Sequence, residues 1–321
     1  MMKSRRFLSL VLACALAVMG VAASAADFPR RPLKIVVPFG AGGSGDLTIR
    51  TLLKFVDFGQ PAVIVNMPGG GSSIGVMEVY NSRPDGYTLL ANSPASMVVG
   101  ELKKQFPAGV TSDMIPICVM GVDNPMFCVG KDAPYKTAQE FFEYAKANPG
   151  KIRVGSSGMS TMYINALVVM DSAKVDLNYV SFDSATKSRA ALLGGHIESI
   201  IATISENRAL VAAGDLIPLF VFSAERSPFM PNVPTLKELG YDVTGCLGTR
   251  GVWAPKGTPA EVVEFLEAAF MKGLNNPEFK RVYLEDMGIE PVAWGSAETR
   301  KWVADNTAYY KDLLERYSAK K

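Results

Sequence analysis

The feature that most constrains this chain is an apolar run that breaks into glycines and then continues as helix-like sequence. Residues 34–37 are typical of a strand, and residues 47–54 are typical of a helix, with Ser44 and Asp46 as plausible N-caps. The loop between them has glycines at positions 40, 42, 43 and 45. Glycines adopt positive φ and can turn backbone N–H groups toward a guest, and a helix N-terminus attracts anions. The stretch therefore predicts a strand, an anion-compatible loop and a helix N-terminus.

The loop does not fit the two common phosphate-binding fingerprints. A P-loop ends in Gly-Lys-Ser/Thr, whereas Gly45 is followed by Asp46, whose charge opposes a triphosphate. Gly40, Gly42 and Gly45 match G-x-G-x-x-G, but no acidic residue ends the second expected strand, residues 63–66. A small carboxylate is the better guest, and a structural turn that binds nothing is the alternative.

The first 25 residues have the layout of a secretory signal peptide. Basic residues precede the apolar run 7–23, and Ala23-Ser24-Ala25 supplies a small-x-small cleavage pattern. We expect cleavage near Ala25 and export to the periplasm, because no later apolar stretch is long enough to cross a bilayer. An uncleaved anchor is the weaker alternative. The net charge of +2 over 321 residues gives no nucleic-acid footprint.

Cysteine and histidine usage gives no support for a metal site. Cys118, Cys128 and Cys246 follow the signal peptide, and their odd number and spacing fit neither complete pairing nor a metal. Cys118 and Cys128 can pair if their strands are adjacent, but buried free thiols are favoured. His196 is the only histidine, so zinc chemistry is unsupported and no metal or cofactor is expected.

Several expected strands end in loops of small polar residues. The strand at 87–91 leads to Ser93, and the unit 152–161 repeats the order of strand and polar loop before a helix at 162–171. Further helices are expected over 185–193 and after the segment 203–207. Repeated strand–loop–helix units predict an α/β fold with a parallel sheet in each lobe. Because ligands bind at the carboxyl ends of parallel strands, these loops should converge.

The helices outside these units have clear signals of their own. Thr137 and Glu140 form a capping-box pattern that opens a helix ending near Lys146. Apolar residues recur at helical spacing over residues 259–274 and 297–317.

A set of short segments occurs in the order and spacing of a known family over nearly the whole chain after the signal peptide. They are residues 31–46, 59–61, 66–75, 83–90, 191–196, 224–226, 233–240 and 254–259. With these segments the chain resembles the Bug family, the extracytoplasmic solute receptors of tripartite tricarboxylate transport systems.

The resemblance implies a type II periplasmic-binding fold, in which two lobes joined by two crossing segments close on a solute. Residues 26–125 plus 224–321 would form the first lobe, and residues 126–223 the second. The family binds mostly carboxylates, including dicarboxylates, tricarboxylates, amino acids and aromatic acids. The resemblance implies a receptor that delivers a small organic acid or amino acid to a membrane permease. We expect it to be a monomer without catalytic residues.

The family places one ligand carboxylate against the first strand-to-helix loop and the rest of the ligand against loops of the opposite lobe. The ligand-binding residues expected here are Phe39, Gly40, Ala41, Gly42, Gly43, Ser44, Asp46, Ser93, Ser157, Met159, Ser160, Thr161, Phe182, Asp183, Ser184, Thr203 and Ser205.

The chain departs from the family pattern at residues 181–184, where many relatives have a Tyr-x-Gly-type sequence. Asp183 adds a negative charge that opposes a second ligand carboxylate and suits a ligand amine. A monocarboxylate or a zwitterion is thus an alternative to a dicarboxylate. Arg250 either contributes a charge to the site or forms an outward ion pair.

Two other functions compete with transport. A sensory receptor would have the same fold and would present its closed form to a membrane kinase. A periplasmic hydrolase using Ser157 or Ser160 is disfavoured, because the chain has no G-x-S-x-G motif and its one histidine follows a helix end.

Overall fold

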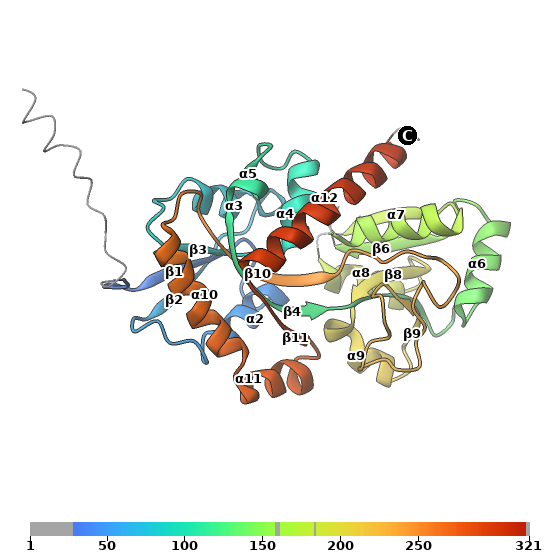
Figure 1. Cartoon of the computed structure of the whole chain (residues 1–321). Helices are drawn as coiled ribbons and strands as arrows, with labels where there is room; N and C mark the ends of the chain where they lie inside the picture. Colours follow the sequence, from blue (N-terminus) through green and yellow to red (C-terminus); the bar gives the residue numbers. More distant parts are fainter. Residues whose placement is uncertain (1–27, 158–160, 183, 319–321) are drawn as a thin grey trace, which may run out of the picture.

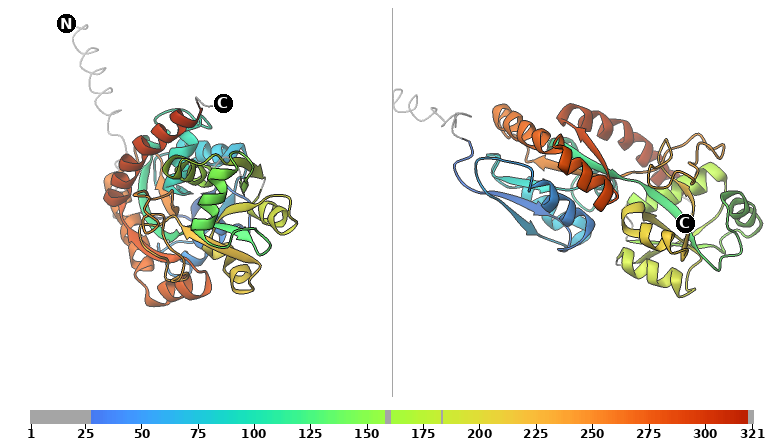
Figure 2. Two further views of the ribbon diagram at one scale, coloured as in Figure 1. Left: turned by 90° about the vertical axis from the view of Figure 1, so that its right-hand side faces the viewer. Right: turned by 90° about the horizontal axis from the view of Figure 1, so that it is seen from below.

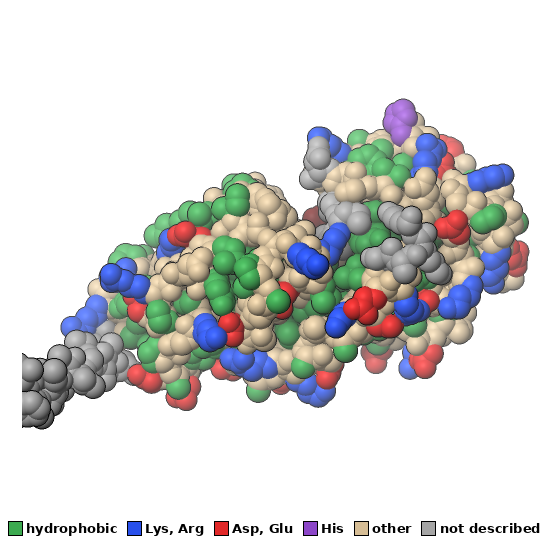
Figure 3. Space-filling model, turned by 90° about the horizontal axis from the view of Figure 1, so that it is seen from above, with side chains coloured by type: hydrophobic (Ala, Val, Ile, Leu, Met, Phe, Trp, Pro, Cys, Tyr) green, Lys and Arg blue, Asp and Glu red, His purple; other side chains and the backbone are tan. Residues whose placement is uncertain are grey.

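The computed structural model describes residues 28–157, 161–182 and 184–318. The signal peptide expected over residues 1–25 lies outside this part of the chain. The described residues form two lobes, each built around its own sheet and joined by extended segments (Figures 1 and 2). Basic and acidic side chains are interspersed on the face shown in Figure 3, in keeping with the small net charge.

The sheet of the first lobe has the strand order β11-β4-β10-β3-β1-β2. β1 runs parallel to β2 and β3, β10 runs antiparallel to β3 and β4, and β11 runs antiparallel to β4. The bounds are β1 Leu33–Val37, β2 Ala62–Asn66, β3 Thr88–Ala91, β4 Ile115–Asp123, β10 Gly248–Ala254 and β11 Glu290–Trp294.

Helices cover both faces of this sheet, which is why its strands are apolar almost throughout. Ile35 packs with α2 and α10 on one face, and its neighbour Val36 packs with α3 and α4 on the other. The bounds are α2 Ser44–Leu52, η2 Gly70–Ser72, α3 Ser73–Tyr80, α4 Pro94–Leu102, α5 Val110–Asp113, α10 Ala260–Leu274, α11 Pro277–Arg281 and η3 Val282–Asp286.

The sheet of the second lobe has the order β7-β6-β8-β5-β9. β6 runs parallel to β7 and β8, whereas β5 runs antiparallel to β8 and β9. The bounds are β5 Pro125–Gly130, α6 Ala138–Ala147, β6 Arg153–Ser157, α7 Thr161–Ala173, β7 Asn178–Phe182, α8 Ala185–Leu193, β8 Ser199–Thr203, α9 Ile204–Ala212 and β9 Leu216–Val221. The bounds of α8 agree with the helix expected at 185–193.

The two-lobed α/β fold is confirmed, but the expectation of a parallel sheet in each lobe is wrong, because both sheets contain antiparallel pairs. β4 continues almost directly into β5 with only Asn124 between them, and β5 joins the second sheet antiparallel to β8 and β9. The chain returns to the first sheet as β10, which the sequence pattern did not predict because its strand contains two glycines and Arg250.

The packing also moves the boundary that we propose between the lobes. Residues 224–247 were expected in the first lobe, yet Thr235 forms a bridge to Val221 of β9, and Leu236 and Cys246 lie in the core of the second lobe. We therefore propose that the second crossing lies at the start of β10. The C-terminal helix α12, Ser296–Ser318, packs against both α4 and α7 and so touches both lobes (Figure 1).

The thiols behave as favoured from the sequence. Cys118, Cys128 and Cys246 are buried and free, which confirms the interpretation as unpaired strand or core residues. Burial raises the pKa of the Cys246 thiol to about 12, so it stays protonated and unreactive at neutral pH.

Candidate functional site

A cavity of about 520 Å³ lies between the two lobes. The first lobe contributes the loops at the ends of β1 and β3, the starts of α2 and α4, and β10. The second lobe contributes the end of β6 and the starts of α7, α8 and α9. The predicted convergence of the polar loops at strand ends is thus confirmed, and it brings several helix N-termini to one space.

The structure brings together part of the expected ligand-binding set. The residues that line the cavity are Phe39, Gly43, Ser44, Ser93, Thr161, Ser184 and Thr203. The residues that lie outside its lining are Gly40, Ala41, Gly42, Asp46, Phe182 and Ser205. Met159, Ser160, Asp183 and the side chain of Ser157 lie outside the described residues.

The start of α2 forms the wall of the cavity in the first lobe. The N-cap is Gly43 rather than Ser44 or Asp46, so the capping role expected for those two residues is wrong. The glycine-rich loop turns at Gly42, which has φ +77°. The first-turn amides of Ser44 and Gly45 have no intrahelical acceptor, because helical N–H groups bond four residues back. They are the natural donors for an anion in the cavity.

Asp46 holds this loop from behind. Its carboxylate is 2% exposed and accepts hydrogen bonds of 2.9 Å from the Gly42 amide, Arg50 Nε and Asn66 Nδ2. The Arg50 hydrogen bond, followed by those of Gly42 and Asn66, lowers the pKa of Asp46 to about 2, although burial opposes the shift. Asp46 is therefore ionised at neutral pH, and its charge is matched by donors that lie away from the cavity.

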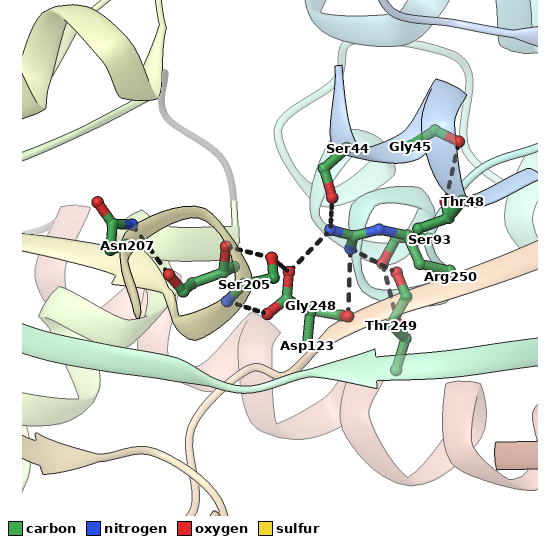
Figure 4. Close-up of polar contacts among 11 residues, drawn as sticks. Ser44, Gly45, Thr48, Ser93, Asp123, Ser205, Asn207, Gly248, Thr249 and Arg250 are labelled. Carbon is green, nitrogen blue, oxygen red and sulfur yellow. Dashed lines mark hydrogen bonds and ion pairs between the residues drawn. The ribbon is translucent and has the colours of Figure 1, made fainter. Parts of the chain in front are cut away.

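Arg250 brings a guanidinium to the cavity from β10 (Figure 4). Its Nη2 donates to Ser44 Oγ at 2.8 Å and lies 3.4 Å from Asp123 Oδ2, while Nη1 donates to the carbonyls of Gly248 and Thr249 at 3.1 Å. Its Nε is buried and has no partner among the described residues. Of the two orientations considered for Arg250, the structure shows the one directed into the site.

Asp123, at the end of β4, links the two lobes. It is fully buried, and it accepts hydrogen bonds from Ser205 N at 3.2 Å and Ser205 Oγ at 2.5 Å in addition to its contact with Arg250 (Figure 4). Burial raises the pKa of Asp123, and Arg250 and Ser205 oppose that shift. Ser205 therefore supports the site through Asp123 instead of lining the cavity.

The hydroxyl groups of Ser93 and Thr249 lie close to Arg250. Ser93 Oγ lies 2.9 Å from Thr249 Oγ1, and Ser93 also caps α4 by accepting from Ser96 N. Asn92 is fixed by its carbonyl, which accepts from Trp253 Nε1. These hydroxyl and amide groups can orient a polar ligand without adding charge.

Glu206 is the acidic side chain that lines the cavity, and the sequence did not single it out. It lies in the first turn of α9 and is open to the cavity solvent. The surrounding protein raises its pKa by desolvation and by the nearby charge of Asp123, while Arg250 and Arg189 oppose the shift. Other lining residues outside the expected set include Gly45, Thr48, Ile49, Gly71, Ser72, Asn92, Ser96, Gln105, Met120, Ser156 and Gly248.

The arrangement is suited to binding. The cavity holds helix N-termini, hydroxyl groups, one guanidinium and one carboxylate from the described residues. His196 is exposed near the end of α8 and is not part of the lining. The hydroxyls of Ser44 and Ser93 contact Arg250 and Thr249, so neither is paired with a histidine base.

Fold and site together define a two-lobed solute-binding protein, and comparison with known proteins identifies its family. Residues 53–318 match the model of the tripartite tricarboxylate transporter family receptor, TctC. A UPF0065 protein of the gbd 5′ region of Cupriavidus necator is 31% identical over 98% of both chains. The chain belongs to this receptor family.

Solved structures agree with this assignment. A TctC solute binding protein from Polaromonas has 31% identity and a TM-score of 0.76, covering 90% of this chain and 99% of that one. MatC from Rhodopseudomonas palustris, solved with bound malate, has 25% identity and a TM-score of 0.76 over 89% and 100% of the chains. Another R. palustris protein, solved with adipate, has 25% identity and a TM-score of 0.79 over 90% and 98%.

Proposed function

We propose that this receptor captures a small carboxylate-containing solute between its lobes in the periplasm and delivers it to a membrane permease of the tripartite tricarboxylate type. It acts as a monomer, without catalysis, after removal of a signal peptide near Ala25. In the part of the chain that the structure describes, no helix has the length and apolar character that a membrane crossing requires.

The observation that carries this proposal is the start of α2 together with Arg250. First-turn amides and the positive end of the helix dipole face the cavity, and the guanidinium is fixed at Ser44 Oγ by a 2.8 Å hydrogen bond. A carboxylate placed there receives hydrogen bonds from first-turn amides that need no rearrangement, and it is attracted by the charge of Arg250. Malate and adipate in the two related structures are dicarboxylates, which supports a carboxylate as the recognised group.

The residues that line the cavity come from both lobes, which supports capture of the solute between them. Ser44 and Ser93 belong to the first lobe, and Thr161 and Ser184 belong to the second, so a ligand that contacts both favours the closed arrangement.

A thermal-shift panel of dicarboxylates, monocarboxylates and amino acids tests the proposal on the mature chain. At least one compound should raise the melting temperature in proportion to the logarithm of its concentration. No response to any acid in the panel would refute the proposal.

Gly43→Val tests the position of the carboxylate. A Cβ at Gly43 would lie 3.3 Å from the Gly40 carbonyl and would project from a residue that lines the cavity. We expect the affinity for the best ligand to fall by about tenfold or more, since a hydrogen bond to a charged group contributes about 1.5–3 kcal/mol.

The matched control is Gly40→Val. A Cβ there meets no atom within 4 Å, and Gly40 does not line the cavity. Titration calorimetry on both folded variants should show a loss of affinity only for Gly43→Val. Equal affinities in the two variants would remove the α2 loop from the site.

A further inference from the structure

Two helices of the second lobe begin with the same pattern, threonine followed three residues later by glutamate. In α6 the pattern forms a capping box: Thr137 Oγ1 accepts from Glu140 N at 3.2 Å, and the Glu140 carboxylate accepts from Thr137 N at 3.1 Å. In α9, Thr203 makes no side-chain capping bond, and Glu206 does not reach back to it. The glutamate of α9 is therefore not engaged in capping.

Two other amides at the start of α9 are bound by the segment that crosses between the lobes. The amide of Ile204 donates to the Asn124 carbonyl at 3.0 Å, and the amide of Ser205 donates to Asp123 Oδ1 at 3.2 Å. These residues occupy the first-turn donors of α9 from outside the helix. The crossing segment thus satisfies two first-turn amides of α9, and the carboxylate of Glu206, which takes part in no capping bond, lines the cavity.

The charges around Glu206 are otherwise committed. The carboxylate of Glu206 accepts no hydrogen bond in the described residues. The neighbouring Arg189 donates instead to the main-chain carbonyl of Glu206 at 3.0 Å and to Asn207 Oδ1 at 3.1 Å. Arg250 is held by Asp123 and Ser44. Asp123 offsets Arg250, and Arg189 acts on the carboxylate of Glu206 through its charge without donating a hydrogen bond to it, so this carboxylate has no hydrogen-bond donor in the described cavity wall.

We propose that Glu206 binds a cationic group of the solute, so that the receptor selects a compound bearing both a carboxylate and an ammonium group. This inference rests on the proposed function, since the carboxylate end is the one assigned to α2 and Arg250. Glu206 lies on the opposite lobe, so ligand binding across the cavity pairs each end of a zwitterion with its complement.

The electrostatics favour this class over dicarboxylates. A second ligand carboxylate near Glu206 would meet a like charge in a partly desolvated site, and like-charge juxtaposition opposes binding. An ammonium group offers three donors to a carboxylate that has no other hydrogen-bond partner in the described structure, and it relieves the repulsion with Asp123.

The experiment measures affinities by titration calorimetry for pairs of compounds that differ in one group. Succinate is paired with β-alanine, glutarate with 4-aminobutanoate, and adipate with 5-aminopentanoate, each second compound having an ammonium in place of one carboxylate. A second series compares α-amino acids with the same monocarboxylates lacking the amine. We expect at least one ammonium compound to bind about tenfold or more tightly than its partner.

Glu206→Gln should then weaken the preferred ammonium compound by about tenfold or more and reduce its preference over the paired acid. The control is Glu264→Gln on α10, which makes the same charge change at an exposed position away from the cavity. The control variant should bind like the wild type. Circular dichroism and melting temperature establish that both variants are folded.

The outcomes separate this inference from the proposed function. Binding of carboxylates with equal or greater affinity than every ammonium partner overturns the inference and leaves the proposed function intact. An ammonium preference that Glu206→Gln does not change also overturns it. Failure of every acid and amino acid to bind overturns the proposed function, and the inference with it.

Discussion

Two helix N-termini face the cavity from opposite lobes, and each has an acidic residue at its third position. In α2 this residue is Asp46, which is 2% exposed, accepts hydrogen bonds from Gly42, Arg50 and Asn66, and has a pKa of about 2. In α9 it is Glu206, which is open to the cavity, has no hydrogen-bond partner for its carboxylate among the described residues, and has a raised pKa.

The difference shows that helix position alone does not assign a role to an acidic side chain. Asp46 uses its charge to fix the backbone that presents the first-turn amides to a ligand. Glu206 binds no amide of its own helix, and Asp123 and Asn124 bind the amides of Ser205 and Ile204. The first residue is thus structural, and the second is available for a ligand.

Replacing the two acidic residues should give the largest difference in unfolding free energy between α2 and α9. Asp46→Ala removes three hydrogen bonds to a buried carboxylate, and we expect the free energy of unfolding to fall by about 3 kcal/mol. Glu206→Ala removes none and should change it by less than about 0.5 kcal/mol. Urea denaturation measures both; similar losses in the two variants would contradict the assignment of separate roles.

Acid titration should show the same contrast. The pKa of Asp46 is lowered from 3.8 to about 2 in the folded chain, so its stabilisation is present above pH 4 and is lost as the pH falls through 2. We expect wild type to lose about 2 kcal/mol more than Asp46→Asn between pH 5 and pH 2. Urea titrations at each pH measure this difference. If the unfolding free energies of the two proteins change equally with pH, the partners of Asp46 do not lower its pKa.

The smallest expected effect concerns the capping of α6 and α9. Thr137→Ala should cost about 1 kcal/mol of unfolding free energy, because it opens a formed capping box. Glu140→Ala opens the same box and should cost a similar amount, whereas Glu206→Ala, at the equivalent position of α9, breaks no capping bond and should cost less than about 0.5 kcal/mol, as measured by urea denaturation. Equal losses in Glu140→Ala and Glu206→Ala would show that Glu206 does cap α9.

Local patterns in the sequence were sufficient for much of the fold. Glycine clusters and polar residues after apolar runs predicted strand-to-helix turns after β1, β3 and β6, and the ends of these strands or the starts of the helices that follow them line the cavity. The capping box at Thr137 was predicted and is present. These features succeed because backbone freedom, capping and alternation of burial depend on residues close together in the chain.

The pairing of distant segments could not be predicted in the same way. β10 has two glycines and no strand-like alternation, yet it lies in the centre of the first sheet between β3 and β4. Without the position of β10 in the sheet, the sequence could not decide whether the side chain of Arg250 points into the site or outward. Its contact with Ser44 joins residues 206 positions apart, and its contact with Asp123 joins residues 127 apart.

The sequence by itself determined that an anion-compatible loop follows the first strand and that the chain resembles a two-lobed receptor. Only the tertiary structure decided that Asp46 faces away from the ligand space and Glu206 faces into it. The physical reason is competition for hydrogen-bond donors. Asn66 and Arg50 satisfy Asp46 from behind α2, whereas the carboxylate of Glu206 accepts no hydrogen bond in the described residues, and the crossing segment binds the amides of Ile204 and Ser205 at the start of α9.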